Sequence, residues 1–157
     1  MQHRMKTHPL TEQQVNQLLQ RAQTGSLVTL NPDGTPYSTP IHFVYCGDAI
    51  FVHGLPKGKK LDNIAHDSRV GFSVYEMDKL LLDPHGKPCD TNTKYESVII
   101  SGTAKLVNDI EEKRNVLKKI AEKYTPHLVN NEIPNNMVKG TAVIRIAVTE
   151  MTGKYYL

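Results

Sequence analysis

The residues best suited to chemistry lie in one basic stretch, residues 51–70. A run ending in His53 has the character of an apolar strand, residues 54–58 form a turn, and Lys59 and Lys60 open a short helical segment. The first N–H groups of a helix lack partners, and the helix dipole favours negative charge there. Lysine adds a mobile charge that suits a phosphate. The stretch predicts an anion pocket. The alternative is a lysine-rich surface turn, since the GxxxxGK[ST] pattern of a P-loop is absent.

Length and charge argue against several classes of protein, including nucleic-acid-binding and membrane proteins. The chain has 157 residues and a formal charge of +3, which favours a single domain spanning residues 1–157 and no nucleic-acid partner. No apolar run approaches the roughly 18 residues of a membrane helix, and the basic start lacks the apolar core of a secretory signal. We therefore expect a cytoplasmic protein without a membrane partner, in which Cys46 and Cys89 are free thiols. The chain has no CxxC motif and its seven histidines are dispersed, so no metal site is expected.

The pattern before the basic stretch predicts one helix and three consecutive antiparallel strands. Thr11 to Gln14 form a capping-box sequence ahead of apolar residues at helical spacing, so a helix is expected over 11–23. The sequence Pro-Asp-Gly at 32–34 separates two β-rich runs, as in a hairpin. The three expected strands span 26–30, 35–45 and 49–53.

The pattern after the basic stretch predicts a small barrel. Prolines and a glycine interrupt residues 76–93, so a long loop is expected there, with Leu80 to Leu82 needing cover. Gly102 is expected to mark a bulge or bend in a long strand. The expected elements are strands over 70–75, 95–107 and 143–148 and a helix over 110–124 capped by Asp109. The fold class is therefore mainly β with flanking helices, with about six antiparallel strands closed into a barrel.

In this order, the pieces resemble the FMN-binding split barrels of the pyridoxamine 5′-phosphate oxidase-like superfamily. Within it, the chain is most similar to the branch named for nitroimidazole resistance. The resemblance rests on short motifs whose order and spacing match over almost the whole chain. These motifs are GTPYSTP at 34–40 leading into HFVY at 42–45, FVHG at 51–54, GKKLDNI at 58–64, Cys89 followed by YESV at 95–98 and Gly102, and MTGK at 151–154.

The resemblance implies that the anion is the phosphate of FMN, in an FMN-binding split β-barrel. Lys60 matches the lysine that holds this phosphate just before the short helix, and Lys59 is a second candidate partner. His53 matches the histidine of the branch. Together with Gly54, it is expected near the phosphate or the ribityl chain.

The resemblance also implies where the flavin ring lies and how the protein assembles. The strand Thr39-Pro40-Ile41 is expected to run along the ring and to offer backbone groups to its polar edge. Proline lacks an N–H, so Pro40 indicates an edge strand or a place where something other than a neighbouring strand is bound. Ser97 belongs to a strand that lies close to the cofactor in the superfamily. The implied partners are a small-molecule substrate and a second copy of the chain, in a homodimer with the flavin at the subunit interface.

The implied activity is that of an FMN-dependent oxidoreductase, which reduces a small substrate such as a nitroaromatic compound. The flavin supplies the electron chemistry and the protein supplies position and electrostatics, so no catalytic side chain is assigned. Pyridoxamine 5′-phosphate oxidase itself fits less well, because residues 151–157 lack its arginine-rich substrate-binding region. The alternatives are a non-catalytic flavin or haem binding protein of the same barrel fold, with His42, His53 or His127 available as axial ligand, and a structural barrel without a chromophore. Each histidine can equally be an ordinary surface or strand-end residue.

Overall fold

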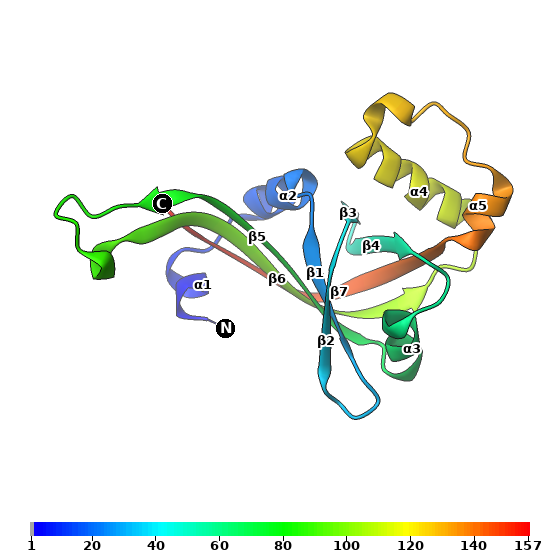
Figure 1. Ribbon diagram of the computed structural model, residues 1–157, viewed down its shortest axis with the longest axis horizontal. Coiled ribbons are helices and arrows are strands. Elements are labelled where there is room, and N and C mark those ends of the chain that lie inside the picture. The colour runs from blue at the N-terminus through cyan, green and yellow to red at the C-terminus, as the bar shows by residue number, and fades with distance from the viewer. Residues whose placement is uncertain (1) are drawn as a thin grey trace.

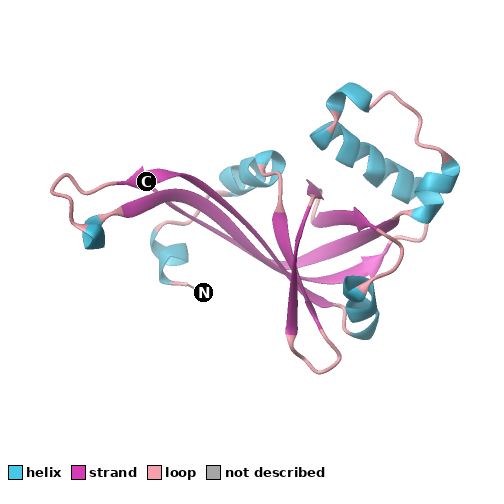
Figure 2. Cartoon of the chain, viewed as in Figure 1, coloured by secondary structure: helices cyan, strands magenta, loops and turns pink. Residues whose placement is uncertain are grey.

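The fold is organised around one antiparallel sheet of seven strands (Figures 1 and 2). The computed structural model describes residues 2–157. The strands are β1 (Gly25–Leu30), β2 (Pro36–Ile41), β3 (Phe43–Cys46), β4 (Ala49–Gly54), β5 (Arg69–Leu81), β6 (Asn92–Leu106) and β7 (Ala142–Tyr156). They lie in the order β2-β1-β5-β6-β7-β4-β3. The expectation of a mainly β fold with flanking helices is confirmed.

The first and last strands of this order are neighbours in sequence, and this curls the sheet. β2 ends at Ile41 and β3 begins at Phe43, with only His42 between them. Since consecutive Cα atoms are about 3.8 Å apart, the two edges of the sheet must approach each other at this point. The prediction of one strand over 35–45 is wrong at His42, because β2 pairs with β1 whereas β3 pairs with β4. Four strands, not three, therefore precede the basic stretch, and the sheet has seven strands instead of about six.

Five α-helices in residues 2–157 flank the sheet. Three lie where the sequence predicted them, namely α2 (Glu12–Arg21), α3 (Lys59–His66) and α4 (Ile110–Tyr124), and two were not predicted, α1 (His3–Thr7) and α5 (Asn135–Gly140). The predicted capping box is present, because the Thr11 side chain accepts from the Gln14 N–H and the Gln14 side chain accepts from the Thr11 N–H. Asp109 caps α4 by accepting from the Glu112 N–H at 2.7 Å. No helix of residues 2–157 is long and apolar enough to cross a membrane.

The core has two parts, one on each face of the curled sheet. The larger part fills the barrel and includes Leu27, Phe43 and Phe72, with α2 and α3 packed against it through Leu18, Leu19, Leu61 and Ile64. The smaller part joins the outer face of β4 and β7 to α4 through Phe51, Val143, Val116 and Ile120. Helix α3 is thus part of the barrel core, although its first residues face outward.

The expected loop over 76–93 is instead mostly a projecting hairpin. We call residues 75–97, the paired ends of β5 and β6 with their connection, the arm. It extends from the barrel on the left of Figure 1. The loop prediction is wrong for residues 76–81, because prolines and glycine occupy only the tip, and pairing continues to Leu81 and Asn92. Leu80 and Leu82, expected to need cover, are 54% and 73% exposed.

Strands β6 and β7 are longer than the sequence indicated. The predicted irregularity at Gly102 is confirmed by a register shift between Ser101 and Gly102 against β7. A Cβ at Gly102 would lie only 2.4 Å from the Ala147 carbonyl oxygen, so glycine is required there. The segment 151–154 continues the closing strand, and β7 therefore reaches from the barrel into the base of the arm.

Candidate functional site

The residues of the predicted anion pocket lie at the start of α3 and at the end of β4. Gly58 precedes the helix with a φ of 143°, a backbone conformation that favours glycine, and no side chain caps the first turn. The N–H groups of Lys59 and Lys60 therefore remain available to an anion, whereas those of Leu61 and Asp62 donate to the Gly58 carbonyl. In Figure 1, α3 lies beside β4, on the opposite side of the barrel from the arm.

Lys60 reaches back over the end of β4. Its Nζ lies 3.3 Å from the place where a Cβ on Gly54 would stand, so the absence of a side chain at Gly54 leaves room for the amine. The ion pairs among residues 2–157 do not include Lys60. The half-buried ammonium group thus lies next to a helix start without a carboxylate to neutralise it.

His53 lies beside this amine, on the same strand end. Its Nδ1 is buried and has no hydrogen-bond partner among residues 2–157. Burial lowers the pKa of His53 below its usual value, and the nearby charges of His42 and Lys60 lower it further. A negative charge bound beside Lys60 would favour the protonated form of the His53 imidazole.

Strand β2 approaches the start of α3 at Tyr37. It is an edge strand, as Pro40 indicated. Pro40 faces outward, whereas Tyr37, Thr39 and Ile41 are half-buried. The hydroxyl Oγ1 of Thr39 is buried without a hydrogen-bond partner in the described chain. Lys59 points toward this strand, with its Nζ 4.9 Å from the Tyr37 ring centroid, so the two lysines have different neighbours.

Ser97 is not brought together with the other predicted site residues. Its Oγ is buried and unpartnered among residues 2–157, but it lies in the arm, where Ser97 pairs with Lys154 of β7. His53 pairs with Val143 of the same strand. These two positions on β7 are separated by about 35 Å of extended chain. Along the sheet, Ser97 is therefore well separated from Lys60 within one chain.

Tyr124, which sequence reasoning did not assign, holds the join between β2 and β3 together with His42. The Oη of Tyr124 accepts from the Phe43 N–H at 2.9 Å and lies 2.8 Å from the carbonyl oxygens of both Phe43 and Gln23. The ring of His42 stacks on that of Tyr124, with centroids 4.5 Å apart. Tyr124 ends a helix 80 residues further along the chain, and nothing local in the sequence marks this contact.

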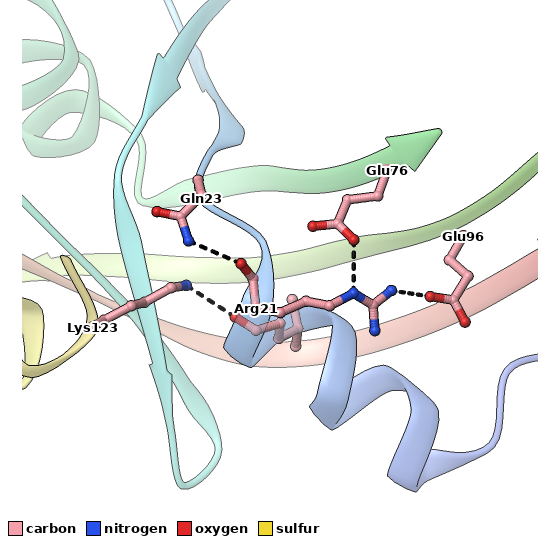
Figure 3. Close-up of polar contacts among 6 residues, drawn as sticks. Arg21, Gln23, Glu76, Glu96 and Lys123 are labelled. Atoms are coloured by element: carbon pink, nitrogen blue, oxygen red, sulfur yellow. Dashed lines mark hydrogen bonds and ion pairs between the residues drawn. The ribbon is translucent and has the colours of Figure 1, made fainter. Parts of the chain in front are cut away.

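A separate polar cluster joins α2 to the base of the arm (Figure 3). Glu76 and Glu96 stand opposite each other on β5 and β6, and the Arg21 guanidinium pairs with both. Nearby, Lys123 donates to the Leu19 carbonyl at 3.1 Å, and burial lowers the pKa of this amine to about 8. A hollow of about 650 Å³ beside Lys123 is lined by none of the predicted site residues. We assign the site by the geometry around Lys60 and not by this hollow.

Comparison with known proteins agrees with the architecture. A family model described as pyridoxamine 5′-phosphate oxidase matches residues 11–155. A crystal structure of a candidate 5-nitroimidazole antibiotic resistance protein from Bacteroides thetaiotaomicron superposes with a TM-score of 0.80 at 24% identity, covering 94% of this chain and 86% of that one. No curated protein matches the sequence significantly.

Two further solved structures are of proteins named for redox cofactors. The flavocytochrome Anf3 from Azotobacter vinelandii has a TM-score of 0.81 at 20% identity, covering 94% of this chain and 68% of that one. The FAD and heme binding protein from Mycobacterium smegmatis has a TM-score of 0.82 at 19% identity, covering 92% of this chain and 71% of that one. At these identities the likeness shows a shared fold.

Proposed function

The chain belongs to the pyridoxamine 5′-phosphate oxidase family, and from that membership we propose that it binds flavin mononucleotide, with the phosphate at the start of α3. The observation that carries this proposal is the convergence of polar groups without partners at one place. These are the buried Nδ1 of His53, the Lys60 ammonium, which pairs with no carboxylate of residues 2–157, and the uncapped first turn of α3. Buried polar atoms without hydrogen bonds are costly, so a ligand that satisfies them explains the arrangement.

The residues present fit the group. A phosphate dianion would accept from Lys60 and the helix N–H groups, and a protonated His53 would add a third donor. Thr39 and the exposed backbone of the edge strand β2 would face the remainder of the flavin. Lys59, held near Tyr37, serves as a secondary source of positive charge.

The visible spectrum of the purified protein tests the proposal. We expect flavin absorption bands and, after denaturation, a released flavin that co-migrates with FMN. Apoprotein titrated with FMN and with riboflavin should bind FMN more tightly, because only FMN carries the phosphate. Equal affinity for the two would remove the phosphate site.

We further propose that the protein is an oxidoreductase that passes electrons from reduced flavin to a small acceptor such as a nitroaromatic compound. A flavin supplies two-electron chemistry when bound. The contribution of this chain is to hold the phosphate and to position the ring along β2. Anaerobic reduction of the flavin followed by addition of a nitroaromatic acceptor should restore the oxidised spectrum faster than in solutions of free FMN.

A homodimer with the flavin at the subunit interface completes the proposal. The arm exposes Tyr75, Met77 and Leu80, of which the first two are 58% and 56% exposed. A register shift between Met77 and Lys79 turns Leu80 to the same face as Tyr75 and Met77, so the three form one apolar surface. Contiguous exposed apolar surface is typical of an interaction site. The arm of a second copy is the element that could bring Ser97 to a flavin bound near Lys60.

The second candidate function is non-catalytic binding of flavin or haem. Two proteins of the same fold are described as a flavocytochrome and as an FAD and heme binding protein. In this chain His42 and His53 lie close together at the proposed site. A Soret band in the purified protein in place of flavin bands would favour haem. Bound flavin that no acceptor reoxidises would favour a carrier.

A further inference from the structure

A buried polar link ties α3 to the β1–β2 hairpin. Asn63, in the middle of α3, is 2% exposed, and its partner Thr29 on β1 is 1% exposed. The side-chain amide of Asn63 donates to Thr29 Oγ1 at 3.0 Å and to Asn31 Oδ1 at 3.1 Å. Asn31 in turn donates from Nδ2 to Thr35 Oγ1 at 2.9 Å, so this link extends into the hairpin turn.

The link occupies the side of the helix that also carries the two lysines. Asn63 follows Lys59 by four residues and Lys60 by three, and residues at these spacings lie on one face of a helix. Two hydrogen bonds from one amide group have defined directions. They therefore fix the rotation of α3 about its axis, and with it the direction in which Lys60 leaves the helix toward Gly54.

The other contacts of α3 are poorly suited to this task. Leu61 and Ile64 pack into the barrel core, but apolar packing has no directional requirement. The helix has only eight residues and no side-chain N-cap, so it cannot maintain its own orientation.

We propose that Asn63 is a positioning residue for the anion site, acting through its hydrogen bonds to Thr29 and Asn31 to hold Lys60 and the first turn of α3 in place. The proposal rests on the proposed phosphate site. It assigns to Asn63 no contact with the ligand.

The test separates positioning from stability with a paired replacement. The double variant Thr29→Val/Asn63→Leu replaces the two buried members of the link by apolar groups of similar shape, which is often nearly neutral for stability. The third member, Asn31, is only half-buried, so its freed side-chain oxygen can bond to water. We expect a melting temperature close to that of the wild type, unchanged riboflavin affinity, and FMN affinity lowered by about tenfold or more, the factor for a lost charge-assisted hydrogen bond. Val74→Ala, a cavity in β5 away from α3, is the control. It should lower the melting temperature and leave the FMN-to-riboflavin ratio unchanged.

Hydrogen exchange on the ligand-free protein gives a readout independent of flavin. Backbone amides of residues 59–66 should exchange faster in the double variant than in the wild type, whereas those of β6 should not change. Unchanged exchange in α3, or an unchanged preference for FMN over riboflavin in a folded double variant, would overturn the role of Asn63. A wild type without preference for FMN refutes the phosphate site instead, and the exchange result still decides whether Asn63 orients the helix.

Discussion

Replacing Lys60 by methionine tests the phosphate site most directly. Methionine keeps an unbranched apolar chain and removes the ammonium group that lies over Gly54. The residue is half-buried and pairs with no carboxylate in the described chain, so its loss leaves no opposite charge unpaired. The variant should therefore fold with nearly wild-type stability.

The expected loss of affinity follows from one charge-assisted hydrogen bond. Such a bond contributes about 1.5–3 kcal/mol, or about 10- to 150-fold in affinity. Lys60 retains contact with solvent, which screens its charge. We therefore expect the lower part of this range, about 10- to 30-fold for FMN. Riboflavin, which has no phosphate, should bind the variant and the wild type equally.

Quenching of flavin fluorescence during titration of the apoprotein measures both affinities. Lys57→Met is the matched control, because Lys57 is exposed in the same turn and its removal changes the net charge equally. A general attraction between a basic surface and an anion would give small, similar losses in both variants and would disappear in moderate salt. Equal FMN affinity in the wild type and Lys60→Met would refute the assignment of the phosphate to this helix start.

Burial lowers the pKa of His53, and this residue should take up a proton when a phosphate dianion binds. FMN affinity should therefore increase as the pH is lowered from about 8 to about 6. The increase should be absent in His53→Gln. In the ligand-free protein the unfolded state binds this proton more readily than the folded state. The free energy of unfolding should therefore decrease as the pH is lowered past about 6.5, and thermal melts should show a smaller dependence of stability on pH in His53→Gln. Arg21→Met should leave the carboxylates of Glu76 and Glu96 facing each other without a cation, and lower the free energy of unfolding by about 1 kcal/mol or less. A second substitution in that variant, Glu96→Gln, should restore the free energy of unfolding measured in urea titrations. By light scattering at micromolar concentration the wild type should be a dimer and Leu80→Glu a monomer; an unchanged mass would show that the arm does not join the subunits.

Local signals in the sequence were sufficient for several elements. The capping box before α2 and the cap Asp109 before α4 concern residues three apart, and both are present. The proximity of the residues proposed to hold the phosphate was predictable for the same reason. His53, Gly54 and Lys60 lie within eight residues, so a strand end, a glycine turn and a helix start bring them together without long-range information.

The errors concern pairing, which depends on distant residues. The segment 35–45 has strand character throughout, yet it splits at His42 because its two halves pair with β1 and β4. Residues 76–81 contain three charged side chains, which resembled a loop, but a ribbon exposed on both faces tolerates them. Asn63 was missed as a buried link, since a single asparagine in a short helix carries no pattern that distinguishes a core position from a surface one.

Ser97 decides whether the proposed site can be completed by one chain. The separation of about 35 Å along β7 exceeds the length of a flavin mononucleotide, so we expect Lys60 and Ser97 to reach one flavin only from different subunits. Loss of the dimer in Leu80→Glu should then lower FMN affinity, although Leu80 lies in the arm and far from Lys60. Lys60→Met should lower FMN affinity without changing the mass. If a monomeric Leu80→Glu protein binds FMN as tightly as the wild type, Ser97 does not belong to the site, and the phosphate and the ring must both be held by the barrel of a single chain.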